Sequence, residues 1–296
     1  MSNAALYVAT ALIWGTTWFA IKFQIGDVAP ELSVAYRFGL ASMILFAYCA
    51  VRGLRFRFDR RAHGFAALLG LLLFCLNYIL YYTATGQVTT GLVALVFSST
   101  ILFNILFGAL FLKSPVRLRV LAGGVIGVGG IGLVFWPELV SPAAAHATPL
   151  GLAIAIVATI FVSLGNIVSA RNQLAGMRVL QTNAVSMAYG AGFTLLIALA
   201  RGQPLAFDWS WPYVVSLAHL SVLGSVVAFG CYLTLLGRIG ADRVAYVNIV
   251  NPLIALGLST LFEGFDWDWV AGAGLLLVLG GNVVAISYRR RPNDGR

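Results

Sequence analysis

Charged residues are scarce in this chain: only 10% of its 296 residues are Asp, Glu, Lys or Arg. A soluble protein carries roughly 25% charge, most of it on its surface. Hydrophobic residues make up 60% of the sequence, and the mean hydropathy is +0.91. A soluble fold of this composition would aggregate, so the composition excludes the water-soluble enzymes and binding domains. It predicts an all-α polytopic membrane protein.

Residues that ligate metals or form disulfides are also few. The three cysteines, Cys49, Cys75 and Cys231, each fall inside an apolar run and have neither disulfide nor metal-site spacing. The three histidines are far apart in sequence. We therefore expect no metal site and no cofactor, and we interpret the cysteines as small core residues.

Apolar runs of about 20 residues recur along the chain, and a helix of that length crosses a hydrocarbon layer of about 30 Å. Breaking the sequence at clusters of charge, Pro and Gly predicts ten spans. Their ranges are 4–23, 32–51, 65–85, 89–112, 120–136, 150–170, 181–200, 213–236, 244–262 and 269–288. The alternative is nine spans, with one of the ten being a core helix that does not cross.

The distribution of Lys and Arg among the loops predicts the orientation. When loops are assigned alternately to two sides, sixteen of the 19 basic residues fall on the side of the N-terminus. The acidic residues lean to the opposite side, and those are Asp27, Glu31, Glu138, Asp208, Glu263, Asp266 and Asp268. Because basic loops stay in the cytoplasm, both termini are predicted to be cytoplasmic. The net charge of +9 is then a topology signal, and nucleic acid is not an expected partner.

The two halves of the chain resemble each other. Residues 72–111, moved by 151 positions onto 223–262 without a gap, share ten of forty residues, among them Tyr81/Tyr232, Thr83/Thr234 and Gly86/Gly237. Each half contains five predicted spans, an odd number, so the second half must enter the membrane from the opposite side. Inverted repeats of this kind are typical of secondary transporters, whose substrate sites lie near the bilayer midplane between the repeats.

This repeat gives the predicted domain organisation. Residues 1–136 form the first five-helix repeat, and 150–288 form the second, inverted one, around a central cavity. Residues 137–149 are a periplasmic linker, and 289–296 are a cytoplasmic tail.

Polar residues inside the third predicted span point to that cavity. In the segment NYILYYTATGQV, residues Asn77, Tyr78, Tyr81, Tyr82 and Thr85 fall on one helical stripe. Tyr78 lies about two turns deeper than the end of the span, where its hydroxyl needs a partner. Tyr78 and Tyr82 either line a cavity or serve as aromatic-belt and packing residues.

Other spans carry polar or aromatic residues at comparable depth. Serines such as Ser98 can instead bond to their own helix, and asparagines can join neighbouring helices, so packing is the alternative in each case. Pro252 would kink its helix and free a carbonyl, so it is a candidate hinge. The predicted substrate-binding residues are Trp14, Thr17, Tyr78, Tyr81, Tyr82, Ser98, Asn166, Tyr232, Asn248 and Asn251. Aromatic surface beside hydroxyl and amide groups suits a small amphipathic ligand better than an inorganic ion.

No Asp or Glu lies in the middle of a predicted span. Proton-coupled transporters commonly use such a carboxylate as a relay, so direct coupling of that kind is disfavoured. The one basic residue well inside a span is Arg37, about five residues into the second. It can snorkel outward, pair with Glu31 or Asp27, or hold a substrate carboxylate.

Two glycine-rich segments, AGGVIGVGGIG at 122–132 and AGAGLLLVLGG at 271–281, end the two halves. Their small-xxx-small spacing predicts close helix packing, as a peripheral scaffold or a dimer face. The protein is accordingly expected to be a monomer or a homodimer.

The ten spans, the two opposed halves and the arginine in AYRFGLASMIL resemble the EamA-type transporters of the drug/metabolite transporter superfamily. The segments TALIWGTTWFAIK and NIVNPLIALGLSTLFEG are most similar to the YddG-type aromatic amino acid exporters of bacterial inner membranes. The resemblance implies alternating access around a central cavity and export of amino acids or related metabolites. Where family members often end the fourth span with Glu, this chain has LFLKSP with Lys113, which argues against a mechanism that needs symmetric acids.

The expected function is therefore a secondary exporter or facilitator of neutral amino acids, aromatic ones included, in the bacterial inner membrane. Transport of nucleobases, nucleotide sugars or drugs is the alternative within this class. A membrane-embedded enzyme would need a nucleophile with a base, and only His219 with Ser221 or Ser225 offers one, without an orienting acid. No catalytic residue is predicted, and a scaffold without transport is the remaining alternative.

Overall fold

The computed structural model describes residues 1–87, 93, 96–134, 136, 149–248, 250, 254 and 268–286. Within these residues the chain is helical and contains no strand. The helices of the first part are α1 (Asn3–Lys22), α2 (Pro30–Val51), α3 (Arg60–Leu71), α4 (Asn77–Thr85), α6 (Thr100–Leu112) and α7 (Leu118–Val134). Those of the second part are α9 (Pro149–Leu174), α10 (Val179–Ala200), α11 (Trp211–His219), α12 (Ala228–Ile239), the short α13 (Ala241–Val244) and α15 (Trp269–Ile286).

Six helical segments are long and apolar enough to cross a membrane, and three shorter apolar helices accompany them. The six are Asn3–Lys22, Pro30–Val51, Arg60–Thr85, Leu150–Leu174, Val179–Ala200 and Trp211–Ile239. Each coincides with a predicted span to within a few residues. The largest shifts are at the start of the predicted span 65–85, which begins at Arg60, and at the end of the predicted span 150–170, which continues to Leu174. The ninth predicted span, 244–262, lies largely outside the described residues, as do the linker and the C-terminal tail.

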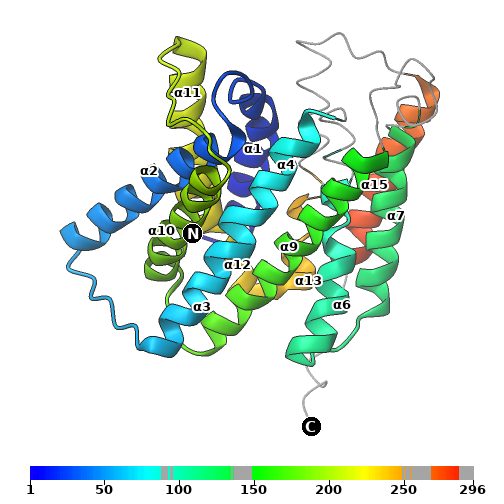
Figure 1. The fold of residues 1–296 in the computed structure, drawn as a ribbon. Coiled ribbons are helices and arrows are strands. Elements are labelled where there is room, and N and C mark those ends of the chain that lie inside the picture. Colours follow the sequence, from blue (N-terminus) through cyan, green and yellow to red (C-terminus); the bar gives the residue numbers. More distant parts are fainter. Residues whose placement is uncertain are drawn as a thin grey trace.

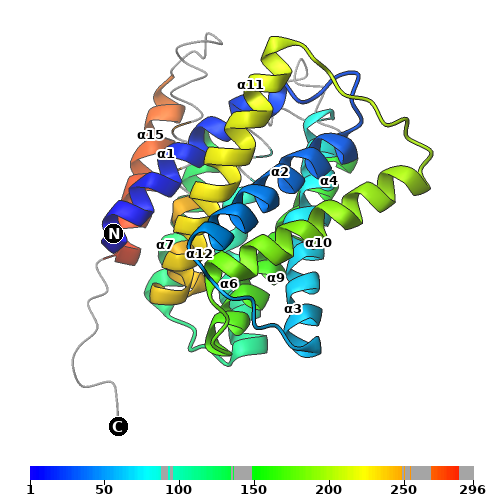
Figure 2. The same ribbon diagram turned by 90° about the vertical axis from the view of Figure 1, so that its left-hand side faces the viewer.

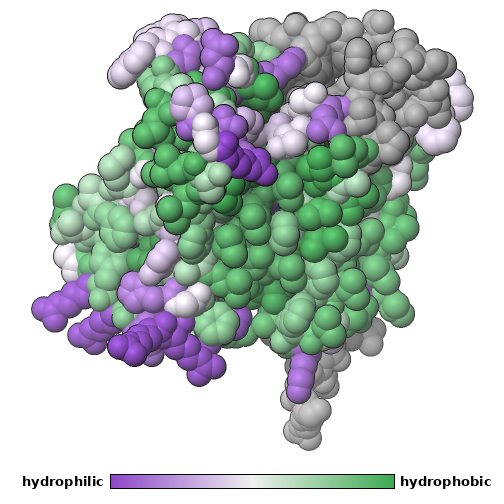
Figure 3. Space-filling view, viewed as in Figure 1, coloured by the Kyte–Doolittle hydropathy of each residue, from purple (hydrophilic) through white to green (hydrophobic). Residues whose placement is uncertain are grey.

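The side chains on the outer surface of the helix bundle are those expected of a protein in a membrane. Figure 3 shows a broad hydrophobic band between two ends where hydrophilic side chains gather. Several large apolar side chains of the helices are exposed, for example Leu106, Leu196 and Leu276. In a soluble protein such a surface would be an aggregation hazard, whereas lipid covers it without cost.

Two of the long helices contain a π-helical stretch. Leu72–Leu76 (η1) joins α3 to α4, and Leu220–Val227 (η3) joins α11 to α12. Moving η1 by 151 positions, the offset of the internal repeat, places it on 223–227, inside η3. π-helical turns displace backbone carbonyls from the regular ladder and are frequent at functional sites. Both stretches lie immediately before residues that line the cavity described below.

The helices form a central group flanked by two tightly packed pairs. In Figures 1 and 2, α2 and α10 lie side by side on one side, α7 and α15 lie together on the other, and α1, α4, α9 and α12 lie between. In each flanking pair one helix comes from each half of the chain. The central group therefore contains most of the residues that can line an internal space, and the two pairs flank it.

The glycine-rich segments meet each other in the α7–α15 pair. A Cβ atom added to Gly130 would lie 2.7 Å from the carbonyl oxygen of Gly274, and one added to Gly281 would lie 2.6 Å from that of Gly123. Only glycine allows such an approach between two backbones. The close helix packing predicted for these segments is therefore found within the chain, at the contact between α7 and α15.

Candidate functional site

A cavity lies between the central helices. It is lined by Trp14, Thr17, Ile21, Arg37, Leu73, Asn77, Tyr78, Tyr81, Phe97, Val162, Asn166, Phe229, Tyr232 and Asn248. These residues come from α1, α2, η1, α4, α9, α12 and the segments near 97 and 248. Both halves of the chain contribute to the wall.

Aromatic rings form much of the cavity wall. The indole of Trp14 packs against the rings of Phe229 and Tyr232, at centroid distances of 4.9 and 4.7 Å. Tyr81 and Phe97 meet at 5.7 Å in a T-shaped arrangement. Trp14 is fixed by its indole Nε1, which donates a hydrogen bond to the carbonyl of Gly224 at 3.0 Å. The π-helical stretch η3 contains this glycine, so its irregular backbone helps to position the ring.

A layer of amides and hydroxyls forms one end of the cavity. Asn166 Nδ2 donates to the Tyr232 hydroxyl at 3.0 Å, and more weakly to Asn104 Oδ1 at 3.4 Å. The hydroxyl of Ser163 donates to the same Asn104 oxygen at 2.6 Å. Asn248 is fully buried at this end, and neither polar atom of its amide makes a hydrogen bond of normal geometry.

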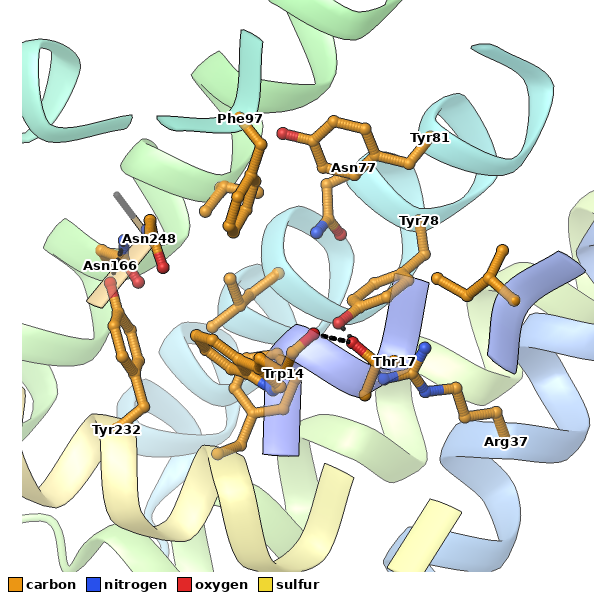
Figure 4. A pocket seen from close by; sticks show the side chains of 14 residues that line it. Trp14, Thr17, Arg37, Asn77, Tyr78, Tyr81, Phe97, Asn166, Tyr232 and Asn248 are labelled. Carbon is orange, nitrogen blue, oxygen red and sulfur yellow. Dashed lines mark hydrogen bonds between the residues drawn. The ribbon is translucent and has the colours of Figure 1, made fainter. Parts of the chain in front are cut away.

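The opposite end contains a buried cation. Figure 4 shows Arg37 beside Thr17 and Tyr78, across the cavity from Asn166, Asn248 and Tyr232. Arg37 is 1% exposed, and its Nε donates to the hydroxyl of Ser225 at 3.0 Å. The snorkelling alternative raised by the sequence is therefore wrong.

The proposed pairing of Arg37 with an acid of the α2 N-terminus is also wrong. Glu31 forms an ion pair with Arg201 at 2.6 Å, and Asp27 is exposed. Glu31 lies one and a half turns before Arg37, on a part of α2 that faces the end of α10. Among the described residues, no carboxylate forms an ion pair with Arg37, which leaves a buried positive charge in the cavity wall.

Several polar atoms in the cavity wall have no hydrogen-bond partner. Ten buried side-chain nitrogen and oxygen atoms of the described residues make no hydrogen bond, and five of them belong to residues of the cavity wall. These five are Nη1 of Arg37, Oδ1 of Asn77, Oδ1 of Asn166, and both polar atoms of Asn248. Buried polar groups are almost always paired in native proteins, so this cluster of unpaired atoms indicates a place where a bound molecule or water supplies the partners.

Corresponding residues of the two halves meet at this cavity. Three pairs of lining residues are separated by 151 positions: Tyr78 and Phe229, Tyr81 and Tyr232, Phe97 and Asn248. The offset is the one at which the halves share ten of forty residues. Phe97 and Phe229 were not among the predicted site residues, and applying this offset to Asn248 and Tyr78 would have identified both.

Seven of the ten predicted substrate-binding residues line the cavity: Trp14, Thr17, Tyr78, Tyr81, Asn166, Tyr232 and Asn248. Tyr82 and Ser98 do not. Tyr82 is rotated by about 40° from Tyr78 at the edge of the polar stripe, and it is buried behind the wall near Arg37. Ser98 is fully buried beside Phe97, which is the residue of that segment that lines the cavity. Asn251 and the candidate hinge Pro252 lie outside the described residues.

A second hollow lies on the other side of the amide layer, with Arg117 and Arg238 in its wall. Asn104 belongs to this wall, and its Nδ2 donates to the carbonyl of Ala241 at 2.9 Å. Because Asn104 is also bonded to Asn166, a single hydrogen-bonded layer separates the two hollows.

The histidine considered for an intramembrane enzyme has other neighbours. His219 Nε2 lies 3.2 Å from the hydroxyl of Thr16. The hydroxyl of Ser225 donates to the carbonyl of Leu220 and accepts from Arg37, and it makes no hydrogen bond with the imidazole. In the part of the chain that the structure describes, no three His, Cys, Asp or Glu side chains are grouped as a metal site requires.

The sequence matches the EamA-like transporter family over residues 1–136 and 149–287. The chain belongs to this family. It is 28% identical to the uncharacterized inner membrane transporter YedA of Escherichia coli over 263 residues, which are 88% of this chain and 81% of the relative. It is 23% identical to the protein PagO of Salmonella typhimurium (90% and 86% covered) and 23% identical to the uncharacterized transporter YoaV of Bacillus subtilis (96% and 97% covered). The assignment to the EamA-type transporters is confirmed, the YddG-type subgroup stays a prediction, and the protein is a multi-pass membrane transporter.

The fold also has a counterpart among solved structures. A crystal structure of a protein 19% identical in sequence superimposes with a TM-score of 0.75, covering 98% of this chain and 99% of its own. At this identity the likeness concerns the fold alone. It extends over nearly the whole of both chains, so the arrangement of helices around the cavity belongs to an established fold.

Proposed function

We propose that this transporter moves neutral amino acids, aromatic ones included, across the bacterial inner membrane by alternating access. The observation that carries the proposal is the cavity itself, whose aromatic walls lie between a buried guanidinium and a layer of amides. Aromatic and aliphatic side chains of a substrate would pack on the rings, and its polar groups would reach the hydrogen-bonding groups at the ends. The inner-membrane location rests on the name of the relative YedA.

The architecture that we propose is ten spans in two inverted repeats, 1–136 and 150–288. Three features support it. The two π-helical stretches are related by the 151-residue offset, and so are three pairs of cavity residues. Each flanking helix pair also combines one helix from each half of the chain. In inverted-repeat transporters the substrate site lies where the repeats meet, which is where these residues are found.

Alternating access requires that the cavity open to one side at a time. We propose that the hollow containing Arg117 and Arg238 lies at the cytoplasmic face, with both termini on that side, because basic loops stay in the cytoplasm. The Asn104–Asn166 layer then acts as the cytoplasmic gate, because it separates this vestibule from the central cavity. A gate made of hydrogen bonds between neutral groups can open without moving a charge.

Uptake of labelled phenylalanine, threonine and methionine into proteoliposomes, with and without a pH gradient, tests the function. We expect saturable uptake of each without an imposed gradient, and mutual inhibition among the three, because they would share one cavity. The control is liposomes containing protein inactivated by heat. Absence of uptake for all three under both conditions would reject the amino acid assignment.

A further inference from the structure

Arg37 carries a charge whose burial is not balanced by an acid. It is 1% exposed, and within the described residues the acid nearest to it on the same helix, Glu31, is engaged by Arg201. Removing a charged group from water costs several kcal/mol unless it is paired. The cost of burying this charge is offset only when an anion binds beside it.

The guanidinium is held in a fixed orientation. Its Nε donates to the Ser225 hydroxyl at 3.0 Å, and that hydroxyl is itself fixed by donating to the carbonyl of Leu220 at 2.9 Å within η3. Its plane lies over the Tyr78 ring, with the guanidinium carbon 4.6 Å from the ring centroid. The positions of Ser225 and Tyr78 thus determine which edge of the guanidinium faces the cavity.

The edge that remains available matches a carboxylate. A guanidinium has five N–H donors. Ser225 accepts from Nε, and the Tyr78 hydroxyl lies 3.5 Å from Nη2, while Nη1 has no partner. Three N–H groups are left, distributed over the two terminal nitrogens. Arginine binds carboxylates through two parallel hydrogen bonds of this kind.

Among the described residues, the cavity wall has no comparable group for an ammonium. The lining residues that the structure describes include neither Asp nor Glu. From these residues a substrate amine would meet neutral acceptors, such as the unpaired oxygens of Asn77 and Asn166, and the faces of the aromatic rings. The carboxylate is therefore the group that the cavity recognises by charge, and the amine is optional.

We infer that Arg37 binds the carboxylate of the substrate, and that the site accepts aromatic and other apolar monocarboxylates, 2-oxo and 2-hydroxy acids as well as amino acids. Amines that lack the carboxylate are rejected. This inference rests on the proposed transport function and narrows it to a chemical class. Molecules that share the aromatic ring of phenylalanine and differ only in the groups beside it should therefore bind with different affinities.

Competition on the unmodified protein tests the inference. Uptake of labelled phenylalanine into proteoliposomes is measured against unlabelled phenylalanine, phenylpyruvate, phenyllactate, phenylalaninamide and phenethylamine. We expect the two amine-free acids to inhibit within about threefold of phenylalanine, and the two carboxylate-free amines to inhibit at least about tenfold more weakly, the loss of one charge-assisted pair. Inhibition by phenethylamine as strong as that by phenylalanine would overturn the inference.

Variants of the arginine give an independent result. Arg37→Gln should lower phenylalanine uptake about tenfold or more, and Arg37→Lys should recover only part of it because the planar fork is lost. Arg52→Gln, at the exposed end of the same helix, is the matched control and should transport normally. Gel filtration checks that each variant is folded. Normal uptake by folded Arg37→Gln would contradict the role of Arg37.

Failure of the inference can be told apart from failure of the proposed function. If phenylalanine is not transported, labelled phenylpyruvate is offered directly. Uptake of phenylpyruvate that depends on Arg37 would retain the carboxylate site and reject the amino acid assignment. Uptake of phenylalanine with no preference for carboxylates would retain the function and reject the site.

Discussion

The Gly281→Ala substitution should destabilise the protein by about 1–3 kcal/mol, the usual cost of forcing extra atoms into a packed interface. The new methyl group would lie 2.6 Å from the carbonyl oxygen of Gly123 and 2.8 Å from the amide nitrogen of Gly127. Both are backbone atoms of α7, so no side chain can rotate away, and α15 has to separate from α7 along the contact. Thermal unfolding in detergent, followed by the loss of monodisperse protein, measures the effect.

The neighbouring glycine is the matched control for this prediction. A methyl group at Gly280 meets nothing within 4 Å, and the residue is exposed on the same helix. Gly280→Ala should therefore unfold at the wild-type temperature. Equal stability of the two variants would mean that α7 and α15 do not approach as closely as the structure indicates.

The Gly224→Ala substitution should raise the KM for phenylalanine about tenfold while leaving the protein folded, which corresponds to about 1.4 kcal/mol of lost binding. The added methyl would lie 3.0 Å from Cγ2 of Thr17 and 3.3 Å from Nη2 of Arg37. Both are ends of side chains, so they can yield by a few tenths of an ångström. The guanidinium would then leave the position in which Ser225 holds it.

Gly230→Ala is the control here, because a methyl at this position of the same span meets nothing within 4 Å. Initial rates of labelled phenylalanine uptake over a range of concentrations separate KM from the maximal rate. A Gly224→Ala protein with the KM of Gly230→Ala would show that the guanidinium does not need its observed position to bind substrate.

The helices were predictable because hydrocarbon imposes a simple rule on sequence. Each span needs about 20 apolar residues, and every polar group within it needs a hydrogen-bond partner inside the protein. The first part of the rule located α1, α2, α10 and the other long helices to within a few residues. The second directed attention to Trp14, Tyr78 and Asn166, which the structure places around one cavity.

The environment of Arg37 could not be predicted in the same way. Ser225, which holds the guanidinium by a hydrogen bond, is 188 residues away in sequence and lies in a π-helical stretch that no local sequence pattern predicts. The nearby Glu31 offered a plausible local partner, but the fold brings Arg201 to it from 170 residues away. Long-range pairing of this kind depends on how α2 packs against α10 and η3, which hydrophobic patterning does not specify.

Tyr82 shows a limit of the helical-stripe argument. A polar stripe tells which face of a helix avoids lipid, but it does not tell which part of that face meets an open space. Tyr78 and Tyr81 face the cavity, while Tyr82, at the edge of the stripe, is buried against the protein. Both positions satisfy the rule that polar groups leave the lipid, so the sequence alone could not separate them.

Protection of an introduced cysteine tests most directly whether the substrate occupies this cavity. Thr17→Cys places a thiol in the wall, in a background where Cys49, Cys75 and Cys231, all buried, are replaced by alanine. Ser210→Cys, in an exposed loop, is the control. We predict that phenylalanine slows alkylation of Thr17→Cys by a small thiol reagent, with the concentration dependence of its transport, and leaves Ser210→Cys unaffected. Alkylation of Thr17→Cys at an unchanged rate, while phenylalanine is still transported, would place the substrate elsewhere.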